Sequence, residues 1–503
     1  MRHKRYFIIS ATLTIIILLH LTTRFRQNGI YSFHEVDEWI LQSTKNESIN
    51  GCEENLDWLK SYQLSYPIKY VSRIISVVPS FNSTRPSLTY ADAPLFPEFS
   101  TVDLEKAKKL STQKCLPPLR VEVTQHDSSN VEASNIIFGL QTTMARLKDT
   151  VKHLNRWLPN TDARLYAIVI ENEGTRADNN EMAKLQQEFH DLHMNVTLMH
   201  PVRADDNFAQ RYFSLVSIMY EARDAKTEWI TCIDDDTFFP SLYDLKAMLA
   251  TYDAKKPFYI GSLSEDWWAV KHYGFMAFGG AGIFLSLPIA EIIYKNRQSC
   301  GHNLRTTAGD ITVMDCIYKF STTKLTHIPA LHQVDIHGDV SGFYESGRDI
   351  LSLHHWKEGS AGYKLEMEKM HLVTSICDTC FLQRWQFSND LLLTNGFSIT
   401  VYPQGHLAHQ ENSIPVSLGV RKINLNAVES TWNDNLDVLH SLAPTRERLS
   451  GDSKKTYRLL DSFLIHDDND KPLVRQIYFL RGEEKENGRR EGDSIISLIW
   501  RRQ

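Results

Sequence analysis

Short apolar runs alternate with segments of helical periodicity between residues 133 and 252. From Met144 to Leu158, for example, the apolar residues recur every three or four positions, which predicts a helix. Strands joined by helices need crossover connections, so this order favours an α/β fold with a mainly parallel sheet covered on both faces. Four runs predict the strands: NIIFGLQ, RLYAIVIE, NVTLMHPV and WITCIDD.

Three consecutive carboxylates, Asp234, Asp235 and Asp236, follow the last of these strands. Ligands of such sheets bind beyond the carboxyl ends of the strands, where these side chains fall. Alternation along an extended chain places Asp234 and Asp236 on one side and Asp235 on the other. Their oxygens suit a hard divalent cation that also holds a diphosphate. The plainer explanation is a cap for the helix that follows Pro240, although one Asp would suffice for that.

A glycine-rich segment, FMAFGGAGIFLS, covers residues 275–286. Gly279, Gly280 and Gly282 allow positive φ or close approach of a substrate to the backbone, and a simple tight turn is the alternative. The segment is not a Walker loop, because no Gly-Lys-Ser/Thr follows it. Nor does the chain carry a dinucleotide fingerprint, because the first strand leads into GLQTT.

Two later motifs carry further candidate groups. Asp310 lies in AGDITVMDCIY, at the start of a predicted helix, and a helix cap is its plainer explanation. His354 and His355 end the apolar run of ILSLHHWK, and neutral imidazole is a common metal ligand.

The order of these motifs resembles the fringe-like branch of glycosyltransferase family 31, whose fungal and plant members have similar GGAG and SLHH segments. The resemblance covers roughly residues 130–360. It implies a GT-A-like nucleotide-sugar-binding domain and an enzyme related to β-1,3-galactosyltransferases. In that family the DxD signature, here Asp234 to Asp236, binds Mn²⁺ through its last carboxylate and contacts the nucleotide sugar through its first.

The resemblance also implies roles for single residues. Asp236, Asp234 and a histidine, His354 in preference to His355, would hold Mn²⁺ or another divalent cation. Asp310 would be the catalytic base, although Gly309 stands where an acid usually precedes it. Other residues would line the donor or acceptor pocket by position: Asp235, Gln141, Thr142, Arg146, Gly280 and Gly282 toward the donor, and Trp267 and Trp268 toward the acceptor. A plain helix start explains Gln141 to Arg146 equally well, and core packing explains the tryptophans.

The implied reaction is an inverting transfer of galactose or N-acetylglucosamine from a UDP-sugar to a hydroxyl of a glycan or glycoprotein, forming a β-1,3 bond. The first alternative is an inactive, membrane-anchored glycan-binding protein of the same fold, which Gly309 favours. A secreted metal-dependent hydrolase is disfavoured, because it needs more metal ligands than one Asp cluster and one histidine. A formal charge of -6 gives no electrostatic case for nucleic-acid binding.

The N-terminus predicts a signal anchor. Arg2, Lys4 and Arg5 precede an apolar run over residues 6–23, which is near the lower limit for a membrane-spanning helix. A cleaved signal peptide is the alternative, but no small-residue cleavage site follows the run. The charges place residues 1–5 in the cytosol and the bulk of the chain in the lumen. Together with the resemblance, this topology implies a single-pass type II protein of the Golgi membrane.

Lumenal features agree with this topology. Asn46, Asn82 and Asn195 begin N-glycosylation sequons. The chain has seven cysteines, and Cys232, inside an apolar strand, is predicted to be the unpaired one. The other six could pair as Cys52–Cys115, Cys300–Cys316 and Cys377–Cys380, although sequence does not determine the connectivity. A redox pair or half of a zinc site is the alternative for CDTC at 377–380.

The rest of the chain falls outside the α/β pattern. Residues 24–125, with scattered prolines, predict a lumenal stem, and 130–360 predict the catalytic domain. Residues 361–503 predict a β-rich C-terminal extension with strands at FSITVYPQG, VRQIYFLR and DSIISLIW, and a helix at KKTYRLLDSFLI.

Overall fold

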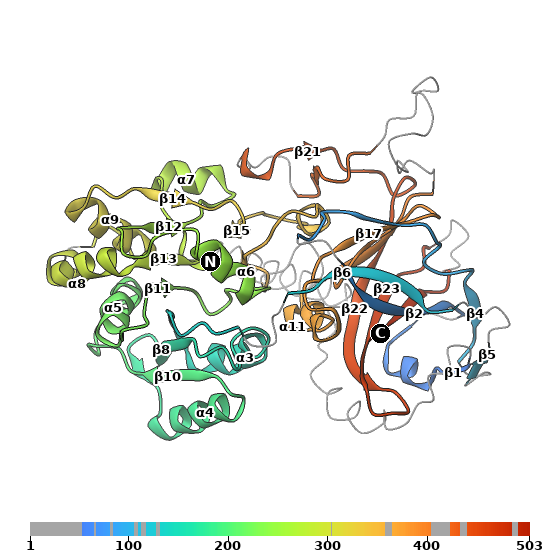
Figure 1. Ribbon diagram of the computed structural model, residues 1–503, viewed down its shortest axis with the longest axis horizontal. Coiled ribbons are helices and arrows are strands. Elements are labelled where there is room, and N and C mark those ends of the chain that lie inside the picture. The colour runs from blue at the N-terminus through green and yellow to red at the C-terminus, as the bar shows by residue number, and fades with distance from the viewer. Residues whose placement is uncertain are drawn as a thin grey trace, which may run out of the picture.

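The computed structural model describes residues 53–64, 67–80, 84–104, 109–111, 117–126, 131–302, 304–357, 365–403, 423–432, 440–484 and 491–503. Two lobes are visible, one of mixed α/β structure and one built on a large β-sheet (Figure 1). The first is made of continuous chain, whereas the second combines segments from both ends of the chain.

The α/β lobe is built on an eight-stranded sheet. Its order is β10 (Asn195–Met199), β8 (Arg164–Asn172), β7 (Ile136–Thr143), β11 (Trp229–Cys232), β13 (Ile283–Ser286), β12 (Tyr259–Gly261) and β14 (Leu325–His327), with β9 (Thr175–Arg176) beside β8. All pair in parallel except β13 and β9, which run antiparallel to their neighbours. The predicted mainly parallel sheet is therefore a mixed one.

Helices cover both faces of this sheet. α3 (Met144–Leu154), α4 (Asn179–Asp191) and α6 (Leu242–Leu249) share one apolar core with alternate side chains of the strands, such as Phe138 and Leu140. α5 (Phe208–Glu221), α7 (Trp267–Tyr273), α8 (Leu287–Gly301) and α9 (Gly309–Phe320) share a second core that includes Ile137. The strands and helices expected between residues 133 and 252 are all present.

Local capping determines where several helices begin. Asp178 accepts hydrogen bonds from Asn180 N and Glu181 N at the start of α4. Asn207 and Gln210 form a capping box at the start of α5. Each cap satisfies backbone N–H groups that have no partner within the helix.

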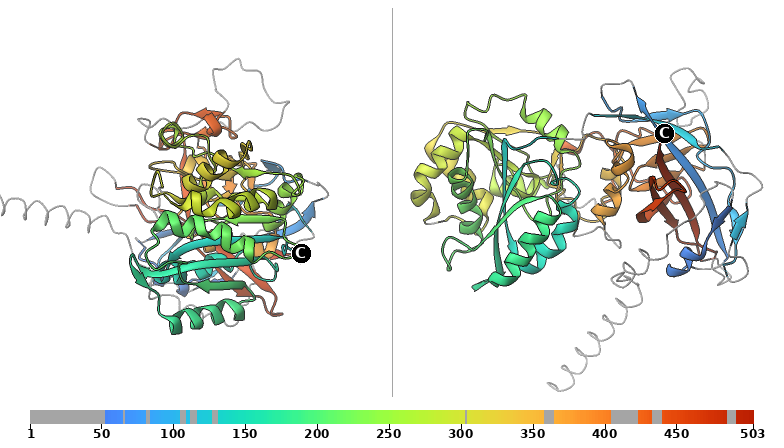
Figure 2. Two further views of the ribbon diagram at one scale, coloured as in Figure 1. Left: turned by 90° about the vertical axis from the view of Figure 1, so that its left-hand side faces the viewer. Right: turned by 60° about the horizontal axis from the view of Figure 1, so that its bottom comes forward.

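The β lobe is a ten-stranded sheet. Its order is β3 (Thr89–Ala91), β17 (Arg384–Phe387), β18 (Leu391–Thr394), β19 (Ser398–Val401), β22 (Lys455–His466), β23 (Pro472–Leu480), β24 (Ser494–Arg502), β2 (Ile68–Ser80) and β4 (Ser100–Val102), with β6 (Leu119–Thr124) beside β2. Both views in Figure 2 show the early strands, in blue, against the late strands, in orange and red. The α/β lobe is thus inserted between two parts of the β lobe.

Two predictions for these regions are wrong. The described part of the expected stem, residues 24–125, contributes strands to the large sheet, because β2 pairs in parallel along its length with β24, more than 400 residues later. The expected helix at KKTYRLLDSFLI is strand β22, which pairs with β19 on one side and β23 on the other. A β-bulge between Leu459 and Asp461 breaks the strand's alternation, which explains the misleading spacing.

Short elements connect the lobes. They are β15 (Leu331–His332), α10 (Ser341–Tyr344), β16 (Ser352–Leu353), α11 (Met367–His371), α12 (Thr374–Cys377), β20 (Val428–Glu429) and β21 (Thr445–Arg446). Across this junction His153 Nε2 of α3 lies 2.9 Å from Glu368 Oε2 of α11, and His371 Nε2 lies 2.8 Å from Pro240 O. Apolar residues of α11 also belong to the core beneath α3.

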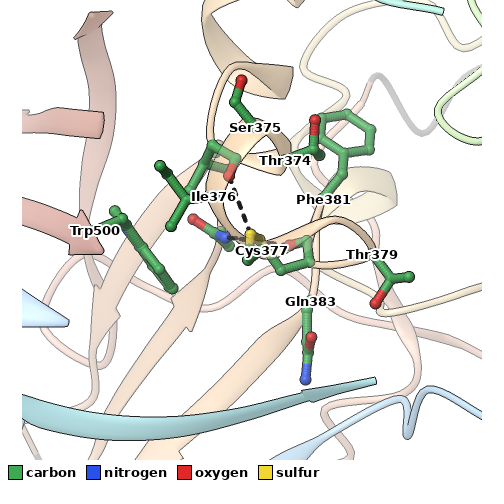
Figure 3. Close-up of a disulfide and its surroundings, with 12 residues drawn as sticks. Thr374, Ser375, Ile376, Cys377, Thr379, Phe381, Gln383 and Trp500 are labelled. Atoms are coloured by element: carbon green, nitrogen blue, oxygen red, sulfur yellow. Dashed lines mark hydrogen bonds between the residues drawn. A yellow bond between two sulfur atoms is a disulfide. The ribbon is translucent and has the colours of Figure 1, made fainter. Parts of the chain in front are cut away.

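The cysteine predictions are confirmed where the structure describes them. Cys300–Cys316 and Cys377–Cys380 are disulfides, and Cys232 is free and buried. The Cys377–Cys380 bridge closes the turn between α12 and β17, close to Trp500 (Figure 3). Cys52 and Cys115 lie outside the described residues, as do Asn46 and Asn82, whereas Asn195 is exposed at the start of β10. None of the helices in the described ranges is long and apolar enough to cross a membrane, and the predicted anchor at 6–23 lies outside those ranges.

Candidate active site

The three consecutive carboxylates divide between two sides of the chain, as predicted, but the cause is a turn beyond the end of β11 (Trp229–Cys232), in which Thr237 N donates to Asp234 O at 3.1 Å, and not an extended strand. His354 Nε2 lies 3.3 Å from Asp234 Oδ2 and 3.0 Å from Asp236 Oδ1. Asp235 points the other way and pairs with Arg146, whose Nε donates to its Oδ2 at 2.6 Å. The helix α6 that follows is capped by Ser241, so the carboxylates are not its cap. Asp234, Asp236 and His354 are called the acidic site below.

Two features hold His354 against the carboxylates. Phe238 and Leu353 form an antiparallel bridge, with Phe238 N donating to Leu353 O at 2.8 Å and Leu353 N donating to Phe238 O at 2.9 Å. This bridge brings the residues that flank it, Asp236 and His354, to the same place. Gly280 then makes room for the imidazole, because a Cβ at Gly280 would lie 2.1 Å from His354 Nδ1.

The charges of the acidic site are strongly coupled. Burial alone would lower the pKa of His354, but hydrogen bonds and charges from Asp234 and Asp236 outweigh it and raise this pKa to about 10. Burial alone would raise the pKa of Asp236, but the hydrogen bond and charge of His354 hold it well below its usual range. One imidazolium therefore balances two carboxylates, of which only Asp234 is substantially exposed.

The donor set of the acidic site fits a hard divalent cation such as Mn²⁺. Two carboxylates and one imidazole are ordinary ligands of such ions, and their negative charge exceeds what one imidazolium neutralises. Among the described residues no His, Cys, Asp or Glu cluster has the geometry of an assembled metal site. His354 instead contacts each of the two carboxylates at hydrogen-bond distance.

Asp310 faces the acidic site across the glycine-rich turn η3 (Gly279–Ala281). Its Oδ2 accepts from Gly279 N at 3.2 Å and its Oδ1 accepts from Ile311 N at 2.8 Å. The N-cap of α9 is Ala308, so Asp310 is not the cap that the plainer explanation required. Burial, and then the charge of Asp234, raises the pKa of Asp310 to about 6, against opposing backbone hydrogen bonds.

Gly309, where an acid was expected, is in close contact with Tyr212 of α5. A Cβ at Gly309 would lie 2.3 Å from Tyr212 Cβ and 2.5 Å from its Cγ. Any side chain at this position would displace the tyrosine. The absence of an acid here therefore has a steric cause in the packing of α5 against α9.

The residues predicted to bind the nucleotide are partly engaged within the protein. Both oxygens of Asp235 are taken by Arg146, and Thr142 Oγ1 donates to Oδ2 as well. Gln141 Oε1 accepts from buried Arg211 at 3.2 Å. Thr143 is the N-cap of α3, so the helix-start explanation holds for this segment. Asp235 thus has a structural pairing, whereas the Arg146 side chain stays 59% exposed beside it.

Sequence reasoning missed a buried polar network next to the acidic site. His355 Nδ1 lies 2.6 Å from Asp335 Oδ1, and Ser264 Oγ donates to Asp335 Oδ2 at 2.5 Å. Glu265 Oε2 accepts from Asp335 N at 3.2 Å, and its Oε1 lies 3.1 Å from His332 Nδ1. The network decides between the two histidines: His354 faces the carboxylates, while His355 turns to Asp335. No sequence motif identifies Asp335 or His332.

The glycine and tryptophan predictions have separate outcomes. Gly280 packs against His354, and Gly282 has φ +99°, which favours glycine. Trp268 is 59% exposed at the start of α7 and stacks on His272 with ring centroids 4.8 Å apart. Trp267 is half-buried, with Lys271 Nζ 5.3 Å from its ring centre. Trp267 also packs against the core shared with α5, α8 and α9, as the core-packing explanation expects, and no described contact places either ring on the acidic site.

A cavity of about 470 Å³ opens elsewhere on the same edge of the sheet. It is lined by Glu171, Arg176, Ala177, Asp178, Asn179, Glu181 and His200, around the first turn of α4. None of the acidic-site residues lines it. Its position beyond the end of β8 places it near the sheet edge that carries the acidic site.

Comparison with known protein sequences adds two findings. A family model described as "Protein of unknown function, DUF604" matches residues 269–388, a range that includes Gly280, Asp310 and His354 but not the three aspartates. The human protein β-1,3-glucosyltransferase is 26% identical over 156 residues, which are 30% of this chain and 30% of that protein. The chain thus spans less than a third of the relative's length.

Solved structures show weaker similarities. A mannosyltransferase from Pyrobaculum calidifontis, in complex with GDP-Man and Mn²⁺, has a TM-score of 0.28 at 10% identity, covering 41% of this chain and 59% of that chain. The apo form of mouse xyloside xylosyltransferase 1 has a TM-score of 0.26 at 12% identity, covering 38% and 84%. TM-scores of this size do not establish a shared fold.

Proposed function

We propose that this protein is a glycosyltransferase that moves a hexose from a UDP-sugar to a hydroxyl group of a glycan or glycoprotein, with inversion and with Mn²⁺ or a similar divalent cation. The observation that carries the proposal is the convergence of Asp234, Asp236 and His354 at the carboxyl edge of the sheet, opposite Asp310. The partial match to β-1,3-glucosyltransferase supports the same class of reaction.

Asp236, His354 and Asp234 would hold the cation. A divalent cation bound there would supply Lewis-acid stabilisation of the negative charge on the departing diphosphate. His354 is the group whose proton must leave for its Nε2 to serve as a ligand. Gly280 keeps the imidazole aligned by leaving its ring room, and the bridge of Phe238 to Leu353 keeps the two sides of the site together.

Asp310 would act as the general base. The acceptor hydroxyl attacks the anomeric carbon, its proton passes to the Asp310 carboxylate, and the bond from that carbon to the diphosphate oxygen breaks with its electron pair on the diphosphate. Displacement in one step turns an α-linked donor into a β-linked product. A base pKa of about 6 suits this role, because the carboxylate is mostly ionised near neutral pH yet remains a competent proton acceptor.

The finer assignments are part of the same proposal. They are galactose or N-acetylglucosamine as the sugar, a β-1,3 linkage, and a single-pass type II location in the Golgi membrane. The position of the acidic site beyond the carboxyl ends of the parallel strands of the α/β lobe supports the choice of a nucleotide sugar. The resemblance of the motif order to the fringe-like branch supports the rest.

A panel of UDP-sugars tests the proposal. Full-length protein in detergent is assayed for UDP release with and without an acceptor glycan, and with and without EDTA. We expect release with one donor, loss with EDTA, and recovery with Mn²⁺. Asp310→Asn should lower the rate roughly 10²–10⁴-fold, whereas Asp315→Asn, an exposed carboxylate of the same helix paired with Arg305, should leave it unchanged.

An inactive glycan-binding protein is the remaining alternative. Gly309 favoured it, but Tyr212 gives that glycine a packing reason that is independent of activity. If the protein binds a glycan but neither releases UDP from any donor nor binds UDP in Mn²⁺, the alternative is correct and the glycosyltransferase proposal is wrong.

A further inference from the structure

Tyr212 carries a buried hydroxyl group without a hydrogen-bond partner among the described residues. Its side chain extends from α5 toward the active site and the residue is 2% exposed. An unsatisfied buried O–H destabilises the fold, a penalty that phenylalanine at the same position would avoid. The hydroxyl group therefore calls for a reason other than packing.

The ring lies between the two glycines that border Asp310. Gly309 contacts its Cβ and Cγ, and a Cβ at Gly279 would lie 2.5 Å from Tyr212 Oη and 3.6 Å from Asp310 Cβ. The phenol oxygen and the Asp310 carboxylate thus flank the same residue, Gly279. The absence of a side chain at both glycines leaves the space that the tyrosine fills, and its hydroxyl group lies next to Gly279, whose backbone N–H donates to Asp310.

The groups that interact electrostatically with Asp310 and Tyr212 from neighbouring elements are the Asp234 carboxylate, the Tyr259 phenol and, on Tyr212, the buried Cys232 thiol of β11. Asp234 faces both from the end of β11, and Tyr259 faces both from β12. Burial, and then the charge of Asp234, raises the pKa of Tyr212 well above its ordinary value, so the phenol stays protonated. The protonated phenol can therefore donate a hydrogen bond, and a neighbouring carboxylate can accept it.

We propose that Tyr212 is a positioning residue for Asp310, whose carboxylate accepts a hydrogen bond from the phenolic O–H when substrates are bound. The role rests on the proposed glycosyltransferase function. The present bond from Gly279 N to Asp310 Oδ2 is long, at 3.2 Å, and bonds to catalytic groups commonly tighten or rearrange when substrate binds. The phenol would hold the carboxylate in one orientation and favour its ionised form.

Tyr212→Phe removes the hydroxyl group and keeps the ring between the two glycines. We expect kcat to fall roughly ten- to hundredfold with the KM for the UDP-sugar unchanged. The acid limb of the pH–rate profile should move up by about one pH unit, because loss of a donor to the ionised carboxylate raises its pKa. Tyr220→Phe, the same change two turns along α5, should move neither quantity.

Two kinetic outcomes would overturn the proposal. Equal kcat and an unmoved acid limb in Tyr212→Phe would leave the hydroxyl group without a role in the reaction. A raised KM with kcat retained would mean that the phenol binds the substrate directly instead of positioning Asp310. An inactive wild type would overturn the proposed function and this role together, whereas an active wild type with an equally active Tyr212→Phe would overturn this role alone.

Thermal unfolding of the resting protein tests the premise without any activity. Tyr212→Phe should unfold at the same or a higher temperature than wild type, because it loses an unsatisfied group. Thr231→Val in β11 is the matched control, because Thr231 is fully buried and its Oγ1 also lacks a partner among the described residues. A midpoint that falls in Tyr212→Phe alone would show that the hydroxyl group already has a partner at rest, which contradicts the proposal.

Discussion

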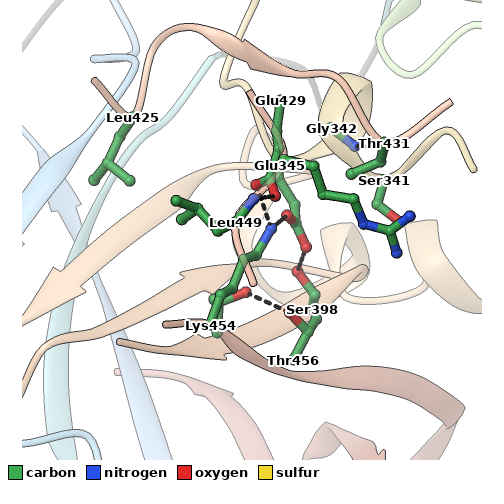
Figure 4. A network of polar contacts seen from close by, with 12 residues as sticks. Ser341, Gly342, Glu345, Ser398, Leu425, Glu429, Thr431, Leu449, Lys454 and Thr456 are labelled. Carbon is green, nitrogen blue, oxygen red and sulfur yellow. Dashed lines mark hydrogen bonds and ion pairs between the residues drawn. The ribbon is translucent and has the colours of Figure 1, made fainter. Parts of the chain in front are cut away.

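Two groups of buried carboxylates in this protein differ in how their charge is balanced. At the junction of the lobes, Lys454 Nζ lies 2.6 Å from Glu345 Oε2 and 2.7 Å from Glu429 Oε2 (Figure 4). Arg458 and Arg446 add a second cation to each glutamate, at 3.3 and 2.7 Å. In the acidic site, by contrast, the one ion-pair partner that Asp234 and Asp236 have within the described residues is the imidazole of His354, which they share.

The comparison distinguishes buried carboxylates that stabilise the fold from carboxylates that are available to bind a ligand. The junction cluster, Glu345, Glu429, Lys454, Arg446 and Arg458, has a cation for each carboxylate, and Ser398 Oγ donates to Glu345 Oε1 as well, at 2.8 Å. Such a set needs no ligand. The acidic site keeps surplus negative charge at the edge of a sheet, where a cation can reach it, and gives up stability to do so.

Removing the shared cation of the junction cluster should have the largest effect on stability. Lys454→Met leaves two buried glutamates facing each other, and breaking a buried ion pair from one side typically costs about 3–5 kcal/mol. Lys455→Met is the control, because the neighbouring lysine is 44% exposed and pairs with exposed Glu483; its effect should stay within about 0.5 kcal/mol. Urea unfolding at pH 7 measures the free energy of unfolding of both variants. Equal losses in Lys454→Met and Lys455→Met would mean that the junction cluster does not stabilise the fold more than an exposed ion pair does.

In the acidic site the corresponding change should affect binding far more than stability. Asp236→Asn keeps an oxygen that accepts from His354, and Asp234 stays in place, so the resting protein should lose no more than about 1 kcal/mol. Its affinity for Mn²⁺ and for UDP in Mn²⁺ should fall about ten- to hundredfold or more. Calorimetric titration of Mn²⁺ and then UDP measures this.

Asp235→Asn is the matched comparison for that experiment. This carboxylate is buried with Arg146 and Thr142 and faces away from His354. It should cost roughly 1–3 kcal/mol of stability and leave Mn²⁺ affinity nearly unchanged. If Asp235→Asn lowered the Mn²⁺ affinity and Asp236→Asn left it unchanged, the assignment of Asp236 to a cation would be wrong.

The same contrast explains what could be predicted from the sequence. The split of Asp234 and Asp236 from Asp235 was predicted correctly, although it arises from a local turn after β11 and not from strand alternation. The α/β order between residues 133 and 252 is local in the same sense. Nothing in the sequence provides a physical ground for preferring His354 to His355, because the contacts that separate the two involve Asp335 and Gly280, which lie elsewhere in the chain.

The β lobe was predicted less well for a related reason. Strand β2 looks like an irregular spacer until β24 pairs with it, and β22 has apolar spacing that also suits a helix. Long-range pairing overrides local preference in both places. The junction cluster and the contact of Tyr212 with Gly309 likewise join residues about 100 positions apart, and no motif marks them.

Filling the space at Gly280 should have an intermediate effect. A Cβ there would lie 2.1–2.2 Å from three atoms of the His354 ring, so Gly280→Ala must shift the imidazole. Overpacking of this kind typically costs 1–3 kcal/mol, and Mn²⁺ affinity should fall with it. Gly451→Ala in the β lobe meets nothing within 4 Å and is the control. If Gly280→Ala is as stable as the wild type and binds Mn²⁺ with the same affinity, His354 is not part of the cation site.

Acid should weaken the junction cluster through Glu345. Burial alone would raise the pKa of this residue, but Lys454 and Arg458 outweigh it and hold the pKa below its ordinary value. A depressed pKa stabilises the fold above the unfolded pKa of about 4.3, and this contribution is lost as pH falls below that value. Unfolding measured from pH 7 to pH 3 should therefore show a shallower acid slope in Glu345→Gln than in wild type. Equal slopes would mean that Glu345 is not held ionised by its neighbours.

The smallest effect should come from an exposed side chain that neither cluster contains. Trp268 is 59% exposed at the start of α7 and contacts His272 and Tyr273, so Trp268→Ala should change stability by less than about 0.5 kcal/mol. If the ring stacks on the acceptor sugar, its loss should raise the acceptor KM several-fold and leave the KM of the UDP-sugar unchanged. Leu464→Ala in β22 removes a comparably exposed apolar side chain, 47% exposed, from the β lobe and should change neither constant. An acceptor KM that stays constant in Trp268→Ala would confine carbohydrate recognition to the sheet edge around Asp310, and α7 would then be no more than a cover for the core beneath it.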